Sequence, residues 1–224
     1  MSYSTISCNR DTMKQTLIYG AELTESGFPI LSSVNLSPSD TVDFRTSLSR
    51  TMRDHASKMV NFYLHDEKFE AVWNNPDKYL NHFRAFYCIA GLDFSIDTQM
   101  PLVMQMWNKY RNHALSFYLN ANGISVIPNA NILPEKCWGW CWEGLPTDST
   151  LCCSTNGRVR SRAARNEFCR CFAEMERQLR PFRVILIGHP IPELTAHAEI
   201  IQLSARNQQI KEGFNHGDCH RVQP

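Results

Sequence analysis

One unit recurs along this chain: a short apolar run that stops at polar residues and is followed by a helical stretch. It occurs in clear form at residues 88–95, 124–131, 150–157 and 183–189. Strands that alternate with helices predict a parallel sheet. Such sheets bind their ligands at the carboxyl ends of the strands. The sequence therefore predicts an α/β fold and locates its site at that edge.

Other segments complete the predicted fold. Further strands are expected at 28–31 and 59–64, and helices at 101–119, 161–180 and 195–212. A complete (β/α)8 barrel has eight strands and typically about 250 residues, more than this chain supplies. We therefore expect a mainly parallel, abbreviated or irregular TIM-barrel-like fold, with an open doubly wound sheet as the alternative.

Composition places the chain among compact proteins. With 224 residues and 43% apolar content it can bury a core as one domain. We expect a loose arm over 1–26, a single α/β domain over 27–212 and a polar tail over 213–224. The sequence has neither an apolar run of about 20 residues, as a membrane span needs, nor a secretory signal pattern. An odd number of cysteines, nine, indicates free thiols in the cytoplasm.

The strongest local motif follows the run at 150–153. It reads Ser154-Thr155-Asn156-Gly157 and leads into four arginines, of which Arg158 is the first. Glycine permits close backbone approach to a ligand, a helix start favours anions, and guanidinium groups bind phosphate or carboxylate. The motif predicts an anion site, although a helix cap with a solvated basic face explains it as well.

Two residues at predicted strand ends are candidates for proton transfer. Asp93, in Leu92-Asp93-Phe94-Ser95, follows a buried strand and could act as a general base. His189 ends the last clear strand and could shuttle protons, a common role of histidine side chains. Each also has a structural explanation: Asp93 as a cap of the next turn, and His189 as a hydrogen-bonded structural residue.

Three further polar residues are candidates for substrate binding. Asn129 ends the predicted strand at 124–127, and Asn108 and Arg111 share one face of the helix at 101–119. That face is offset from the apolar stripe, so both side chains could turn toward the strand ends. A surface ion pair is the competing explanation for Arg111.

No cofactor is identifiable, and no metal site is predicted. Cys137 and Cys141 share no strong zinc spacing with the tail residues His216, Cys219 and His220. A net charge of +1 argues against a general attraction to nucleic acid, so such a partner would need a local basic face. An anionic small molecule or nucleotide remains possible, and no membrane partner is expected.

A collinear set of motifs resembles a family of bacteria and their phages known as domain of unknown function 4417. The resemblance covers residues 27–190. The matching segments are Trp73-Asn74-Asn75-Pro76, Asp93-Phe94-Ser95, Asn108-Lys109-Tyr110-Arg111, Gly123-Ile124-Ser125-Val126-Ile127-Pro128, Gly144-Leu145-Pro146 and Ser154-Thr155-Asn156-Gly157. The sequence departs from the family pattern at Leu92, where proline is expected, and near Asn131, where tryptophan is expected. The resemblance implies a phage or mobile-element setting and no particular reaction.

Two functions fit the sequence. The first is an enzyme acting on a phosphorylated or nucleotide-like anion at the strand ends. The second is a non-catalytic phage or mobile-element factor that binds nucleic acid or a host protein.

Overall fold

Seven parallel strands form the centre of the described part of the molecule. The structure, a computed structural model, describes residues 11–204. The first sheet contains β1 (Asp40–Asp43), β2 (Lys58–Asn61), β3 (Cys88–Ala90) and β4 (Val126–Ile127), and the second contains β5 (Thr150–Ser154), β6 (Arg183–Ile187) and β7 (Glu199–Leu203). Every neighbouring pair is parallel, and a parallel bridge between Asn129 and Cys152 connects the two sheets beyond β4.

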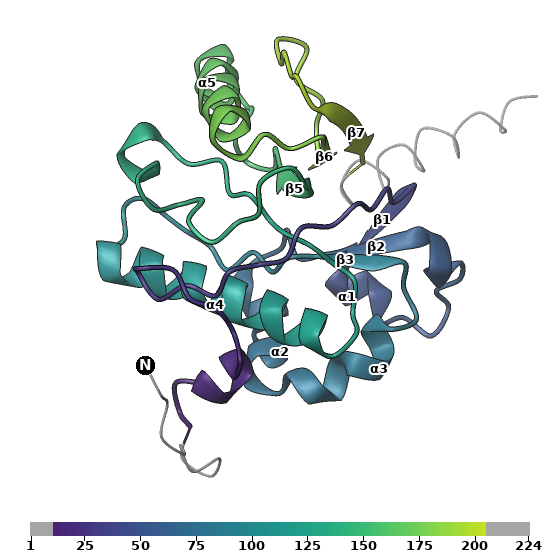
Figure 1. Cartoon of the computed structure of the whole chain (residues 1–224). Helices are drawn as coiled ribbons and strands as arrows, with labels where there is room; N and C mark the ends of the chain where they lie inside the picture. Colours follow the sequence, from purple (N-terminus) through teal and green to yellow (C-terminus); the bar gives the residue numbers. More distant parts are fainter. Residues whose placement is uncertain (1–10, 205–224) are drawn as a thin grey trace, which may run out of the picture.

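The strand order confirms the predicted α/β class with parallel strands. Within each sheet the strands follow one another in chain order (Figure 1). A doubly wound sheet needs a reversal of this order, and the described strands contain none. Over residues 11–204 no pairing of β7 with β1 closes a barrel.

Within residues 11–204, five α-helices and several single-turn 3-10 helices connect the strands. The α-helices are α1 (Phe44–Ser47), α2 (Glu70–Asn74), α3 (Leu80–Phe83), α4 (Leu102–Ala121) and α5 (Arg162–Leu179). The 3-10 turns are η2 (Gln15–Ile18), η3 (His55–Ser57), η4 (Asp66–Lys68), η5 (Pro76–Tyr79) and η6 (Glu135–Cys137).

The two long helices begin and end where the sequence predicts. Pro101 precedes α4, and Gly123, with φ of 77°, follows its end. The Ser161 side chain accepts a hydrogen bond from the Ala164 N–H and so caps α5. Arg180 then adopts a left-handed conformation, which stops the helix.

Alternating side chains give the sheets two different faces. One face packs against α1–α4 through residues such as Val60 and Ile89, and against α5 through Leu151 and Val184. The opposite face converges on a shared apolar cluster of strand residues, against which Tyr63 and the chain around Val34 also pack. That cluster contains Met59, Cys88, Ala90, Ile127, Cys152, Ile185, Ile187 and Leu203.

The segment around residues 34–36 covers the amino ends of the second sheet. The Thr150 N–H donates to the Val34 carbonyl at 2.8 Å, and Arg183 Nη1 donates to the Leu36 carbonyl at 3.2 Å. The side chains of Val34 and Leu36 pack on the shared apolar cluster. This end of the sheet is therefore blocked, which leaves the carboxyl ends as the place for a site.

Two predicted elements differ from the structure, and one strand was not predicted. The helix expected at 195–212 is wrong, because 199–203 forms β7, whose Ile200 and Ile201 suit a strand. Residues 28–31 form only one antiparallel bridge, between Leu23 and Pro29. Strand β1 was not predicted, because residues 35–57 are polar and show little hydrophobic pattern.

The predicted arm and tail are only partly described. Within residues 11–26, Leu17 and Ile18 are buried and pack in the core beside α4. Residues 1–10 and the tail at 213–224 lie outside the described part, so the proposed division of the chain stays a prediction.

Candidate functional site

The strands deliver polar side chains to one edge. Strands β1, β2 and β5 end at Asp43, Asn61 and Ser154, and Asp93 and Asn129 follow the ends of β3 and β4 within three residues. All five line one open cleft of about 1320 Å³. This volume exceeds the roughly 300–1,000 Å³ typical of pockets for single small molecules.

Most of the candidates from the sequence share this cleft. It is lined by Asp93, Asn129, Ser154, Asn156, Gly157, Arg158 and His189. They come from the ends of four strands that are distant in the chain, which is the convergence expected for parallel βα units. Their chemical roles remain predictions.

Asp93 is held by two amides that approach the same oxygen. Asn129 Nδ2 donates to Asp93 Oδ1 at 2.9 Å, and Asn131 Nδ2 donates to that oxygen at 2.7 Å. The Tyr63 hydroxyl donates to Asn129 Oδ1 at 3.1 Å, which fixes the orientation of the amide. The second carboxylate oxygen of Asp93, Oδ2, is thus the one left for a ligand in the cleft.

Burial changes the acidity of this carboxyl group. It raises the pKa of Asp93 from 3.8 to about 6, against the opposing effect of the two amide hydrogen bonds. The nearby Asp66 carboxylate raises the pKa of Asp93 further, whereas the Arg158 guanidinium lowers it. Burial also raises the pKa of Tyr63 well above its ordinary value, so Tyr63 stays a hydrogen-bond donor. A carboxyl group with a pKa near 6 can exchange a proton around neutral pH.

Basic side chains lie on both sides of Asp93. Arg45 follows β1, whereas Arg158 and Arg160 follow β5. None of these three arginines forms an ion pair with another described residue. Arg165 also lines the cleft, but it is paired with Glu193 at 3.0 Å. The three unpaired guanidinium groups are available to an anion.

Three predicted binding residues lie elsewhere. Arg111 Nη2 pairs with Glu70 at 2.5 Å, and its guanidinium carbon lies 3.5 Å from the centre of the Phe94 ring. Asn108 Nδ2 donates to the Ser95 carbonyl at 2.7 Å and is buried. The face they share therefore packs against neighbouring segments and does not reach the cleft.

Thr155 is the third of these residues. It is fully buried, and its hydroxyl donates to the His189 carbonyl at 2.9 Å. It therefore connects the loops after β5 and β6, and only its neighbours Ser154 and Asn156 line the cleft.

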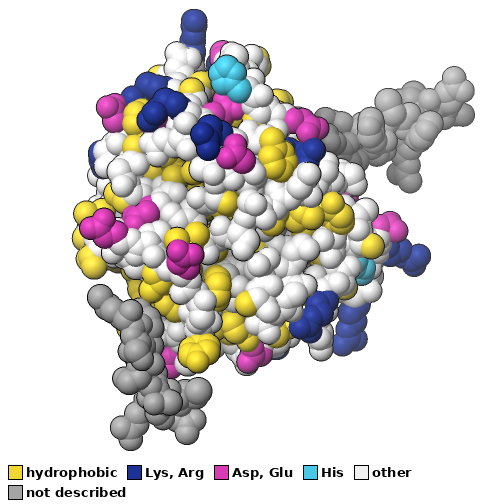
Figure 2. Space-filling view, in the orientation of Figure 1, with side chains coloured by type: hydrophobic (Ala, Val, Ile, Leu, Met, Phe, Trp, Pro, Cys, Tyr) yellow, Lys and Arg dark blue, Asp and Glu magenta, His cyan; other side chains and the backbone are white. Residues whose placement is uncertain are grey.

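Ion pairs neutralise most of the arginines of α5, but of the four arginines that form the predicted basic face only Arg165 is ion-paired among the described residues. Arg170 pairs with Glu135 and Glu167, and Arg177 pairs with Glu174. Figure 2 shows the result, with Lys or Arg and Asp or Glu side chains lying next to one another over this helix. The unpaired arginines of the cleft are a better anion site than the helix surface.

Sequence reasoning missed several residues of the cleft. Asn61 and Tyr63 fell inside the strand expected at 59–64, which ends three residues earlier than predicted. Asn131 was noted only as a departure from the family pattern, and Arg45 lay in a segment without clear periodicity. A signal for Asn131 was available in the sequence. It lies two positions after Asn129, and residues two apart at the end of a strand point to the same side.

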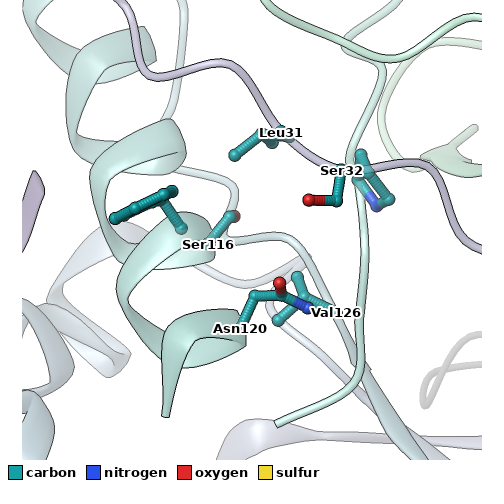
Figure 3. A pocket seen from close by; sticks show the side chains of 7 residues that line it. Leu31, Ser32, Ser116, Asn120 and Val126 are labelled. Carbon is teal, nitrogen blue, oxygen red and sulfur yellow. The ribbon is translucent and has the colours of Figure 1, made fainter. Parts of the chain in front are cut away.

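A second, much smaller cavity lies between α4 and the chain at 31–32. Its volume is about 20 Å³, and Figure 3 shows Ser32, Ser116 and Asn120 around it. This space holds about one water molecule. It is too small for a substrate.

No described group of three or more His, Cys, Asp or Glu side chains is arranged to hold a metal ion. Cys137 and Cys141 are both buried free thiols. The tail residues His216, Cys219 and His220, considered for zinc from the sequence, lie outside the described residues.

Comparison with known proteins identifies the family. The family model described as "Domain of unknown function (DUF4417)" matches residues 22–204, so the chain belongs to this family. It is similar to the "Gene 1 protein" of Mycobacterium phage L5, with 34% identity over 121 residues, which is 53% of this chain and 52% of the relative. The "Gene 1 protein" of Mycobacterium phage D29 is 32% identical over 102 residues, 46% of this chain and 37% of that protein. The chain thus spans about half or less of these relatives. No solved structure matches it.

Proposed function

We propose that this member of the DUF4417 family is a cytoplasmic enzyme that acts on a phosphorylated or nucleotide-like anion. Asp93 is the proton-transfer group, and Arg158, Asn156 and Gly157 bind the anion. The observation that carries the proposal is the position of Asp93. This residue lines a cleft that contains unpaired arginines, its Oδ1 is held by two amides, and its pKa is raised.

The arrangement around Asp93 suits a general base. Asn129 and Asn131 hold Oδ1, so the carboxyl group cannot rotate freely and Oδ2 keeps a fixed position. A mobile Asp93 carboxyl group would lower the rate of proton transfer, because the acceptor must lie within hydrogen-bond distance of the reacting group. A pKa near 6 leaves most of the carboxyl groups ionised at pH 7.5 and still basic enough to accept a proton.

The loop after β5 supplies the proposed anion contacts. Gly157 has φ of 74° and no atom lies within 4 Å of the position that a β-carbon would take, so a ligand can approach the backbone there. Arg158 lies close enough to Asp93 to lower its pKa. An anion bound to Arg158 would offset that effect and make Asp93 a stronger base when substrate is present.

His189 is the second proposed proton-transfer residue. It follows β6 and lies exposed at the cleft. The Thr155 hydroxyl donates a hydrogen bond to the His189 carbonyl and so connects it to the loop after β5. This position allows it to serve a leaving group while Asp93 serves the attacking group.

The location proposed for the enzyme rests on its thiols. All seven cysteines among the described residues are free, as a reducing compartment requires. No helix of residues 11–204 is both long and apolar enough to cross a membrane.

The proposal is tested with a panel of nucleotides and other phosphate esters. Binding is measured by calorimetry, and conversion is followed by phosphate release and mass spectrometry. Asp93→Asn should bind the substrate with similar affinity but lose at least about 100-fold in turnover, the lower range for a general base. Asp97→Asn, which lies outside the cleft lining, is the matched control. Unchanged turnover in Asp93→Asn would refute the role of Asp93 as the proton-transfer group, and absence of any conversion by the wild type would refute the enzymatic function.

A non-catalytic binding factor is the second candidate, and the size of the cleft favours it. A volume of about 1320 Å³ accommodates part of a polymer as well as a small substrate. In that case a ligand binds tightly, no conversion is detected, and Asp93→Asn leaves the affinity unchanged.

A further inference from the structure

We infer that the ligand of the cleft is a single-stranded nucleic acid that extends from the β1 side to the β5 side and passes over Asp93. This inference rests on the proposed function and names its substrate class. Its basis is the distribution of charge along the cleft, in which two separate groups of unpaired arginines flank a centre formed by amide side chains and the carboxyl group of Asp93.

The first step is the spacing of the arginines. Arg45 follows β1 and Arg158 follows β5, and the strands between them lie in chain order. Four strand spacings of about 4.8 Å amount to about 19 Å along the sheet. Asp93 follows β3, the middle strand of the five, and so lies between the two basic groups. A nucleoside monophosphate carries its charge on one phosphate, so it could pair with only one of the two basic groups.

The second step is the chemistry of the centre. Asn61, Asn129 and Asn131 line it with neutral amide groups, which donate to and accept from sugars and base edges. Two residues with aromatic rings, Tyr63 and His65, are also among the residues that line the cleft. Single-strand binding sites combine such rings with positive charges along the backbone path.

The third step is the match between charge and ligand. The chain has a net charge of only +1, and the arginines of α5 are largely paired with glutamates. The unpaired arginines Arg45, Arg158 and Arg160 are instead found at the two ends of one cleft. Phosphodiester groups on both sides of a reacting bond fit this pattern, and DNA and RNA share that backbone chemistry.

The test measures fluorescence anisotropy with labelled hexamers of deoxythymidylate and of uridylate, at several salt concentrations. Arg45→Gln and Arg158→Gln should each weaken binding of the hexamer. Each should also reduce the slope of log K against log salt by about 0.7, the value for one lost phosphate contact with a single strand. Arg177→Gln, whose side chain pairs with Glu174 outside the cleft lining, should change neither quantity.

Unlabelled nucleoside monophosphates and a duplex of equal sequence serve as competitors. Both should compete more weakly than the unlabelled hexamer, and the two labelled hexamers show whether DNA or RNA is preferred. The inference is overturned if a monophosphate competes as well as the hexamer, if Arg45→Gln has no effect, or if no hexamer binds.

The inference and the proposed function can fail separately. If only mononucleotides bind and are converted in an Asp93-dependent manner, the function stands and the extended ligand is refuted. If hexamers bind through both arginines but are not converted, the enzymatic function is refuted and the ligand class stands.

Discussion

Replacing Asp93 with Asn should stabilise the folded protein at neutral pH. The folded state holds Asp93 with a pKa of about 6 instead of 3.8, so burying the charged carboxylate costs free energy above pH 6. About 2 pKa units correspond to about 3 kcal/mol. Asparagine keeps an acceptor for Asn129 and Asn131 at the Oδ1 position but carries no charge, so it avoids this cost.

The sign of the pH dependence follows from the raised pKa. Between pH 3.8 and 6 the folded state binds more protons than the unfolded state, so wild-type stability falls as pH rises through this window. The variant lacks this titration. The difference in free energy of unfolding should therefore be near zero at pH 3.5 and reach at most about 3 kcal/mol at pH 7.5, since contact with the cleft solvent reduces it.

Urea denaturation followed by circular dichroism at pH 3.5, 5 and 7.5 measures the difference. Asp97→Asn controls for the loss of a surface charge. If Asp93 were a satisfied structural carboxylate, Asp93→Asn would lower the stability at pH 7.5. That result, or a difference independent of pH, would refute the reasoning.

Three further predictions concern two glycines, Gly91 and Gly188, and the buried side chain of Lys109. A β-carbon in Gly91→Ala would lie 2.9 Å from the backbone nitrogen of Asn129, so the variant should lose about 1–3 kcal/mol in urea denaturation, and an unchanged stability would contradict this close approach. In Gly188→Ala the alanine would have to adopt φ of 117°, and its β-carbon would lie 2.5 Å from the Thr155 hydroxyl oxygen. The loop after β5 should therefore shift, and calorimetry should show weaker ligand binding. Burial lowers the pKa of Lys109 to about 7, so above pH 7 the unfolded state binds more protons than the folded state. The free energy of unfolding should therefore rise from pH 7 to 9.5 by up to about 3 kcal/mol. Urea denaturation at the two pH values measures this rise, which Lys109→Met should abolish.

The parts of the fold that the sequence predicts are those with a strong local pattern. The apolar stripe and the proline predict α4, and the aliphatic run at 184–187 predicts β6. Strand β7 was missed because it is short and its adjacent Ile200 and Ile201 stand in a polar stretch without the alternation typical of a strand. Its identity depends on pairing with β6, a contact that is distant in sequence.

The candidate site shows the same limit. Parallel strands bring their ends to one edge, so Asp93, Asn129 and Ser154 could be grouped without coordinates. The fate of Arg111 could not, because it depends on Glu70 and Phe94, which approach the helix only in the folded protein. Arg45 was equally hidden, since its place in the cleft follows from the pairing of the short strand β1.

The most direct test of the account is the titration of the Asp93 side-chain carboxyl carbon by NMR, assigned through its loss in Asp93→Asn. The account predicts a pKa near 6 in the free protein and a higher pKa once an anion occupies the cleft. Titration near the ordinary value of 3.8, unaffected by hexamers or nucleotides, would contradict it.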